Sequence, residues 1–125
     1  MSETYFSPWR DVEAALPQIP PFALVFFLRG NAWAERGNLD RAIADYDAAI
    51  TINPSFAEAY INRGIACAKK GYLERAIADY EAALRINPRD AKAIKNRSLT
   101  FKLQDDLTQV LNSIKNSRMA TSRQK

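Results

Sequence analysis

Residues 57–90 read AEAYINRGIACAKKGYLERAIADYEAALRINPRD, and residues 23–56 read ALVFFLRGNAWAERGNLDRAIADYDAAITINPSF. The two blocks align without a gap, and 18 of their 34 positions carry the same amino acid. Chance does not give this similarity, and a fixed period of this length is typical of proteins that stack one structural unit repeatedly. The repeat therefore sets the organisation of the rest of the chain.

Each block is predicted to form two helices, because apolar and small residues recur in it at helical spacing. Gly37 and Gly71 divide the blocks into halves, which indicates an antiparallel hairpin. Pro54 and Pro88 follow the second half and stop its helix. One hairpin cannot bury both of its faces, so the hairpins are expected to stack.

The distribution of small and large residues supports close packing of these helices. Gly30 and Gly64 can sit where two helices cross closely, opposite Ala42 and Ala76. The large residues Tyr46 and Tyr80 are expected to fill space toward the next hairpin.

With these residues in these positions, the chain resembles the tetratricopeptide repeat (TPR) family. Arg29 and Arg63 depart from the family pattern, which usually has Leu there, and Cys67 replaces a usual aromatic. The resemblance implies an all-α fold, an α-solenoid of about three antiparallel helical hairpins with an N-terminal extension. The residues that carry the resemblance are Phe26, Gly30, Trp33, Ala42, Tyr46, Ala49 and Pro54, and in the second copy Tyr60, Gly64, Ala76, Tyr80, Ala83 and Pro88.

The flanking segments complete the predicted organisation. Residues 1–21 form an N-terminal extension, in which Ser7 and Pro8 could begin a short helix that ends at Leu16. Residues 22–118 form the repeat domain, and residues 119–125 a disordered basic tail. A third copy, residues 91–118, lacks the glycines, has Gln104-Asp105 at the turn, and is expected to act as a degenerate capping repeat. The predicted helices are 22–36, 39–52, 56–70, 73–86, 90–103 and 105–118.

Composition excludes several classes of site. The chain has no histidine and a single cysteine, Cys67, which removes His-based catalysis, Cys–His pairs and His/Cys zinc sites. The acidic residues Asp45, Asp47, Asp79 and Glu81 recur with the period, so a solvated helix face explains them better than a catalytic pair. We therefore expect no enzymatic activity, no cofactor and no metal.

The apolar run at residues 22–28 ends at Arg29, far short of the roughly 20 residues that span a membrane. No transmembrane segment or signal peptide is predicted, and a cytoplasmic location is expected. The net charge of +4 comes from residues 91–125, which hold 8 basic and 2 acidic side chains. Nucleic-acid binding is not favoured, because Phe101 is the only aromatic residue available there for base stacking.

The resemblance also implies that the first helix of each repeat lines a concave groove that binds a polypeptide. The groove grades from apolar to basic, which favours a protein or peptide partner that is apolar with an acidic end. The alternatives are coverage of the apolar part by Tyr5, Phe6 and Trp9, or a homo-oligomer assembled through the apolar N-terminal half. The expected groove residues are Leu24, Phe27, Leu28, Asn31, Ile61, Asn62, Ile65, Lys92, Lys95, Asn96 and Leu99, together with Glu35, Glu58, Lys69 and Lys102.

Some members of the family bind acidic chaperone C-termini through a two-carboxylate clamp of Lys, Asn, Asn, Lys and Arg. Asn31, Asn62 and Lys92 match this clamp, whereas Phe27 replaces its first Lys and Asn96 its Arg. The two losses remove much of the charge-assisted pairing on which such recognition depends.

Overall fold

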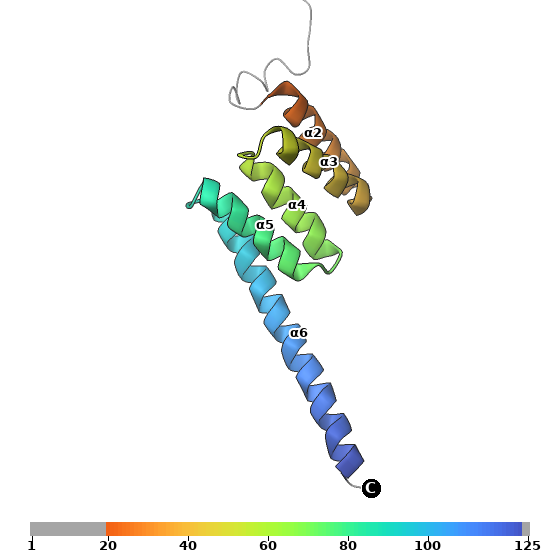
Figure 1. The fold of residues 1–125 in the computed structure, drawn as a ribbon. Helices are drawn as coiled ribbons and strands as arrows, with labels where there is room; N and C mark the ends of the chain where they lie inside the picture. Colours follow the sequence, from red (N-terminus) through yellow and green to blue (C-terminus); the bar gives the residue numbers. More distant parts are fainter. Residues whose placement is uncertain (1–19, 124–125) are drawn as a thin grey trace, which may run out of the picture.

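The two repeats form two antiparallel hairpins of helices that stack side by side, followed by one long helix (Figure 1). This computed structural model describes residues 20–123, and these contain no strand. The all-α solenoid predicted from the repeat is therefore confirmed. The helices are α2 (Pro21–Glu35), α3 (Leu39–Ile52), α4 (Ala57–Lys69), α5 (Leu73–Ile86) and α6 (Ala91–Arg123).

The turns within the hairpins depend on glycine. Gly37 has a φ of 79° and Gly71 a φ of 86°, in the left-handed region that other residues rarely adopt. These residues end α2 and α4 and reverse the chain. After Gly37, the Oδ1 atom of Asn38 accepts a hydrogen bond from the backbone N–H of Arg41 at 3.2 Å and caps α3.

The core is a row of three buried clusters, each of which joins consecutive helices. The first contains Leu24 of α2, Ala49 of α3 and Ala59 of α4. The second joins α3, α4 and α5, and the third joins α4, α5 and α6. Each hairpin is thus completed by its neighbour, as expected for a stacked repeat. Helix α4 contributes to all three clusters.

The prediction of a third helical hairpin is wrong. Residues 91–123 form the single helix α6, which extends well beyond the stacked hairpins (Figure 1). Asp105 stands where Gly37 and Gly71 stand in the earlier copies, so the positive-φ turn residue is missing and the helix continues. The predicted helices 90–103 and 105–118 are therefore one element, and there is no capping hairpin at residues 91–118.

The disordered tail predicted from residue 119 is also corrected, because residues 119–123 belong to α6. The short helix predicted from Ser7 to Leu16 lies outside the described residues. Within residues 20–123, no helix is long and apolar enough to cross a membrane.

Candidate functional site

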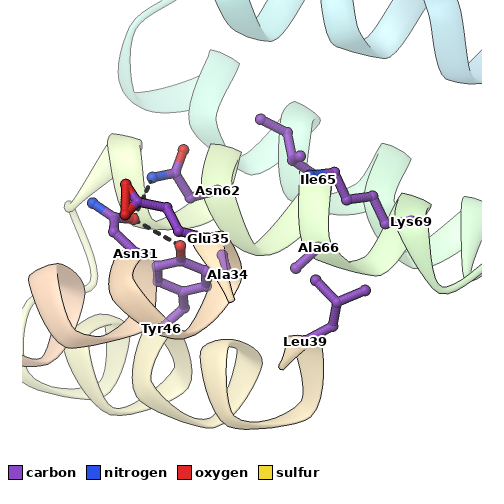
Figure 2. A pocket seen from close by; sticks show the side chains of 9 residues that line it. All are labelled: Asn31, Ala34, Glu35, Leu39, Tyr46, Asn62, Ile65, Ala66 and Lys69. Atoms are coloured by element: carbon purple, nitrogen blue, oxygen red, sulfur yellow. Dashed lines mark hydrogen bonds between the residues drawn. The ribbon is translucent and has the colours of Figure 1, made fainter. Parts of the chain in front are cut away.

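A hollow of about 270 Å³ opens on the side of the stack formed by α2 and α4. Figure 2 shows Asn31, Tyr46 and Asn62 meeting on one side of the hollow. Ile65 and Lys69 lie on the other side. The hollow therefore combines a polar and a partly apolar wall. Its lining residues are Asn31, Ala34, Glu35, Leu39, Tyr46, Asn62, Ile65, Ala66 and Lys69.

A row of hydrogen bonds crosses the polar wall. The Oδ1 atom of Asn31 accepts a bond from the hydroxyl of Tyr46 at 2.7 Å and another from Nδ2 of Asn62 at 2.9 Å. Burial raises the pKa of Tyr46 to about 12, so its hydroxyl remains a donor at neutral pH. The carboxamides of α2 and α4 are thereby held in one orientation across the two repeats.

Lys92 of α6 extends this row to a third helix. Its Nζ atom lies 3.5 Å from Oδ1 of Asn62 and 3.9 Å from Oε2 of Glu58. The side chains of Lys92 and Glu58 are each 51% exposed, so the pair is loosely held and the ammonium can exchange partners. Asn31, Asn62 and Lys92 therefore lie in one row, each on the first helix of a successive repeat.

Two of the expected groove residues are not on the surface, and their assignment is wrong. Leu24 is 2% exposed and packs with Ala49 and Phe56, while Ile61 is fully buried with Ala83 and Ala93. In both cases, helices later in the chain pack over a side chain that the family resemblance predicted to line the open groove. Neither side chain can contact a partner in this structure.

Phe27 and Leu28 are half-buried and pack against the first cluster, which joins α2, α3 and the start of α4. The ring centroid of Phe27 lies 4.7 Å from that of Phe56 and 6.0 Å from that of Tyr46. The residue that replaces the first Lys of the carboxylate clamp is therefore part of an aromatic cluster.

The remaining predictions fall on α6. Lys95 is exposed, and the Nδ2 atom of Asn96 donates to the backbone carbonyl of Lys92 at 2.9 Å. Leu99 is 55% exposed. It belongs to an exposed apolar series on α6 that includes Leu99, Leu103, Leu107, Val110, Leu111 and Ile114. The structure thus brings Asn31, Asn62 and Ile65 together at the hollow and adds Lys92 beside it, but leaves Lys95 and Leu99 outside.

Sequence reasoning missed the part that Tyr46 takes in this site. The expectation that the ring fills space toward the next hairpin agrees with the hollow, which Tyr46 lines together with Asn62 and Ile65 of α4. The contacts that it did not foresee are those of Tyr46 and Tyr80 with the glycines of their own hairpins. A Cβ atom added to Gly30 would lie 2.7 Å from Cε1 of Tyr46, and one added to Gly64 would lie 2.7 Å from Cε1 of Tyr80. Each tyrosine follows its glycine at the same separation in the sequence, and this constant separation is the signal that could have placed the ring.

Two of the four acidic residues assigned to a solvated face, Asp45 and Asp79, are buried instead, whereas the side chains of Asp47 and Glu81 are 46% and 45% exposed. Asp45 and Asp79 are 6% and 4% exposed, and each accepts two hydrogen bonds from an arginine 16 residues earlier. Arg63 bonds Asp79 at 2.7 Å and Asp47 of the preceding repeat at 2.7 Å. Burial lowers the pKa of Arg63, but the bonds to Asp79 and Asp47 outweigh it and raise the pKa above the ordinary value. The arginines that depart from the family pattern thus link helices within and between repeats.

Cys67 is a free, fully buried cysteine in the second cluster, as its place on a packed face predicts. Burial raises the pKa of its thiol, which therefore stays protonated and packs as a small apolar group.

Comparison with protein families gives two matches. A family described as TPR repeat matches residues 30–71, and a family described as tetratricopeptide repeat matches residues 57–90. The comparison with curated proteins gave no significant match.

Several solved structures share the fold. The first TPR of Spaghetti (RPAP3) bound to the HSP90 peptide SRMEEVD is 28% identical, with a TM-score of 0.64, over 67% of this chain and 69% of that chain. The second TPR domain of human RPAP3 in complex with the HSP70 peptide SGPTIEEVD is 28% identical, with a TM-score of 0.61, over 62% of this chain and 65% of that chain. The Arabidopsis OM64 TPR domain is 25% identical, with a TM-score of 0.66, over 68% and 70% of the two chains.

Proposed function

Because this chain belongs to the tetratricopeptide-repeat family, we propose that it is a protein–protein interaction scaffold. The proposed site is the surface formed by α2, α4 and α6, and its ligand is a segment of another polypeptide. The observation that carries the proposal is the row of Asn31, Asn62 and Lys92, which presents polar groups from three successive repeats beside one hollow. Two of the similar TPR structures hold acidic peptides, which supports this choice of ligand class.

The chemistry of the row favours a ligand with a carboxylate. Asn62 has a second amide hydrogen beyond the one that bonds Asn31, and Lys92 offers an exposed ammonium. Both can donate to a carboxylate, and bonds to charged groups are the stronger ones. Ile65, on the other wall of the hollow, can contact an apolar side chain of the same ligand.

The site differs from a complete two-carboxylate clamp at two places. Phe27 is packed against Phe56, and the amide of Asn96 is bonded to the backbone of Lys92. Only one strong carboxylate position remains, near Lys92. We therefore expect affinity of about micromolar strength, near −8 kcal/mol, rather than tighter binding.

Titration of a fluorescent SRMEEVD peptide by anisotropy tests the proposal. Lys92→Glu should weaken binding by about tenfold or more, because it replaces attraction to a carboxylate with repulsion. Lys115→Glu is the matched control, since it makes the same charge change on the exposed part of α6, away from the hollow. Binding to the unaltered chain should also weaken as salt is raised.

The proposal fails if both glutamate variants bind equally well while circular dichroism shows unchanged helicity. Absence of saturable binding to the unaltered chain at millimolar peptide would exclude this ligand class. Self-association through the N-terminal half and a cytoplasmic location stay predictions, and light scattering measures the first directly.

A further inference from the structure

One side of α2 is exposed at positions whose equivalents, one period later, are buried at the N-cap of α4 or within α4. Phe22 is 73% exposed, whereas Phe56, one period later, is 3% exposed. Val25 is 38% exposed, whereas Ala59 is fully buried. The side of α4 is covered because α3 packs on it, as the cluster of Ala49 with Phe56 and Ala59 shows.

The same contrast continues along the helix. The side chain of Arg29 is 60% exposed, whereas that of Arg63 is 18% exposed. Ala32 is exposed, whereas Ala66 is 2% exposed and packs with Ile43 of α3. We call Phe22, Val25, Arg29 and Ala32 the outer face of α2. Among residues 20–123, no helix covers it.

The sequence just before α2 repeats the second-helix motif of the later hairpins. Residues 11–20 read DVEAALPQIP and residues 79–88 read DYEAALRINP, so 6 of 10 positions are identical at an offset of 68. This offset is two periods of the repeat. Residues 11–20 thus hold the place in the repeat that residues 45–54 and 79–88 occupy in α3 and α5 and their following turns.

We propose that residues 8–16 of this chain dock as a helix on the outer face of α2, as α3 docks on α4. Pro8 suits the first turn of such a helix, and Pro17 ends it about half a turn earlier than α3 ends. By the period, Trp9 takes the place of Ile43 and Leu16 the place of Ile50. Both of those residues pack in the clusters that join α3 to α4, so Trp9 and Leu16 supply the apolar contact.

Charge complementarity fixes the same register. Arg63 pairs with Asp47, and Arg97 lies 4.0 Å from Glu81, so each arginine meets an acid on the preceding helix at one constant separation in the sequence. Glu13 precedes Arg29 by this same separation. Arg29 pairs with Asp45 of its own repeat, and its exposed side chain leaves room for this second acid.

Docking of residues 8–16 on the outer face of α2 differs from coverage of the hollow by the same segment. The hollow presents a row of carboxamides and Lys92, whereas the outer face of α2 presents Phe22 and Val25. Trp9 and Leu16 match the apolar outer face better than the polar row. The stack gains one helix at its N-terminal end, and the hollow stays open to a partner.

Hydrogen–deuterium exchange of the full chain tests the docking. Amides of residues 12–16 should exchange about tenfold or more slower than in the Glu13→Lys variant. Asp11→Lys is the matched control: its side chain lies on the opposite side of the same helix, and the equivalent Asp45 pairs within its own hairpin. Val25→Glu on the outer face should release the segment, whereas Ile65→Glu in the hollow should leave its protection unchanged.

Three results would overturn the proposal. Exchange of residues 12–16 at unfolded rates in the unaltered chain would show that the segment does not dock. Release by Ile65→Glu with retention in Val25→Glu would place it over the hollow instead. Protection that falls on dilution would assign the contact to a second copy of the chain. Circular dichroism of each variant confirms that α2 to α6 remain folded.

Discussion

Arg63 shows how a departure from the family pattern can be structural. Its position and the recurring acids are both visible in the sequence, yet neither alone indicates a buried pair. The signal that indicates the pair is the separation of 16 residues, which places Arg63 and Asp79 on the two facing helices of one hairpin. A buried charge requires a partner, so the two residues act as a unit.

Replacing Arg63 with Leu, the usual family residue, should lower the free energy of unfolding by roughly 3 kcal/mol. The change leaves the buried carboxylate of Asp79 without its partner, and an unpaired buried charge strongly destabilises the folded state. Arg97→Leu should cost less than about 1 kcal/mol, because its pair with Glu81 is exposed and 4.0 Å long. Urea unfolding measures both, and equal losses would contradict the buried pair.

The contact between Gly64 and Tyr80 gives a second prediction. Gly64→Ala places a Cβ atom 2.7 Å from Cε1 and 3.0 Å from Cδ1 of Tyr80, so it should destabilise by roughly 1–3 kcal/mol. Tyr80→Ala alone should cost roughly 3–5 kcal/mol through the lost ring. In the double variant the added Cβ atom has no ring to clash with. Its loss of unfolding free energy should therefore be clearly less than the sum of the two single losses. Simple additivity in denaturant unfolding would mean that the ring does not press on this glycine.

Tyr46 predicts how stability depends on alkaline pH. Burial raises its pKa to about 12, above the value of about 10 for an unfolded tyrosine. Between these values the unfolded chain loses a proton that the folded chain keeps, so stability is full below about pH 10 and falls as pH rises toward about 12. The loss should reach roughly 2 kcal/mol from this residue. Tyr46→Phe should flatten the profile in thermal unfolding scans, and an unchanged slope would exclude this cause.

At the scale of elements, α6 is where sequence reasoning failed. The apolar spacing of residues 107–114 predicts a helix and is correct, but it does not say whether the chain turns back before it. Two physical conditions for the turn are absent. Asp105 replaces the positive-φ glycine, and Lys95 and Ser98 occupy the positions of Ile61 and Gly64, which contact the second helix in the preceding repeat. A polar face cannot hold a returning helix, so α6 continues.

Deleting residues 105–125 should therefore change stability by less than about 1 kcal/mol, because all side chains from 105 to 121 are exposed and their removal uncovers no core residue. Ala93→Glu is the contrasting variant, because it forces a charge into the fully buried third cluster and should cost several kcal/mol. If the truncated chain unfolds much more easily than the full chain, α6 stabilises the stack through its distal half.

At the scale of the whole molecule, the period and the family resemblance together predict most of the fold and part of the site. The period places α2 to α5 close to their observed bounds, because glycine, proline and apolar spacing act locally. The resemblance to the family, not the period, places Asn31 and Asn62 on one surface. It cannot distinguish Leu24 and Ile61 from exposed groove residues, since their burial depends on how the following helices pack against them.

The row of three clusters predicts how the molecule opens. Leu24 lies in the cluster that joins α2 and α3 to the start of α4, whereas Ile61 lies in the cluster that joins α4 to α5 and α6. Leu→Ala and Ile→Ala changes at such sites lower the free energy of unfolding by roughly 2–5 kcal/mol. In a stacked repeat each unit contacts only its neighbours, so the change destabilises the neighbouring helices first. Leu24→Ala should therefore speed hydrogen exchange mainly in α2 and α3, while Ile61→Ala should speed it from α4 to α6. Leu99→Ala, at an exposed position, serves as a control that should alter neither. Uniform acceleration from α2 to α6 in both variants would show that the stack opens as one unit, because neither end could then separate from α4.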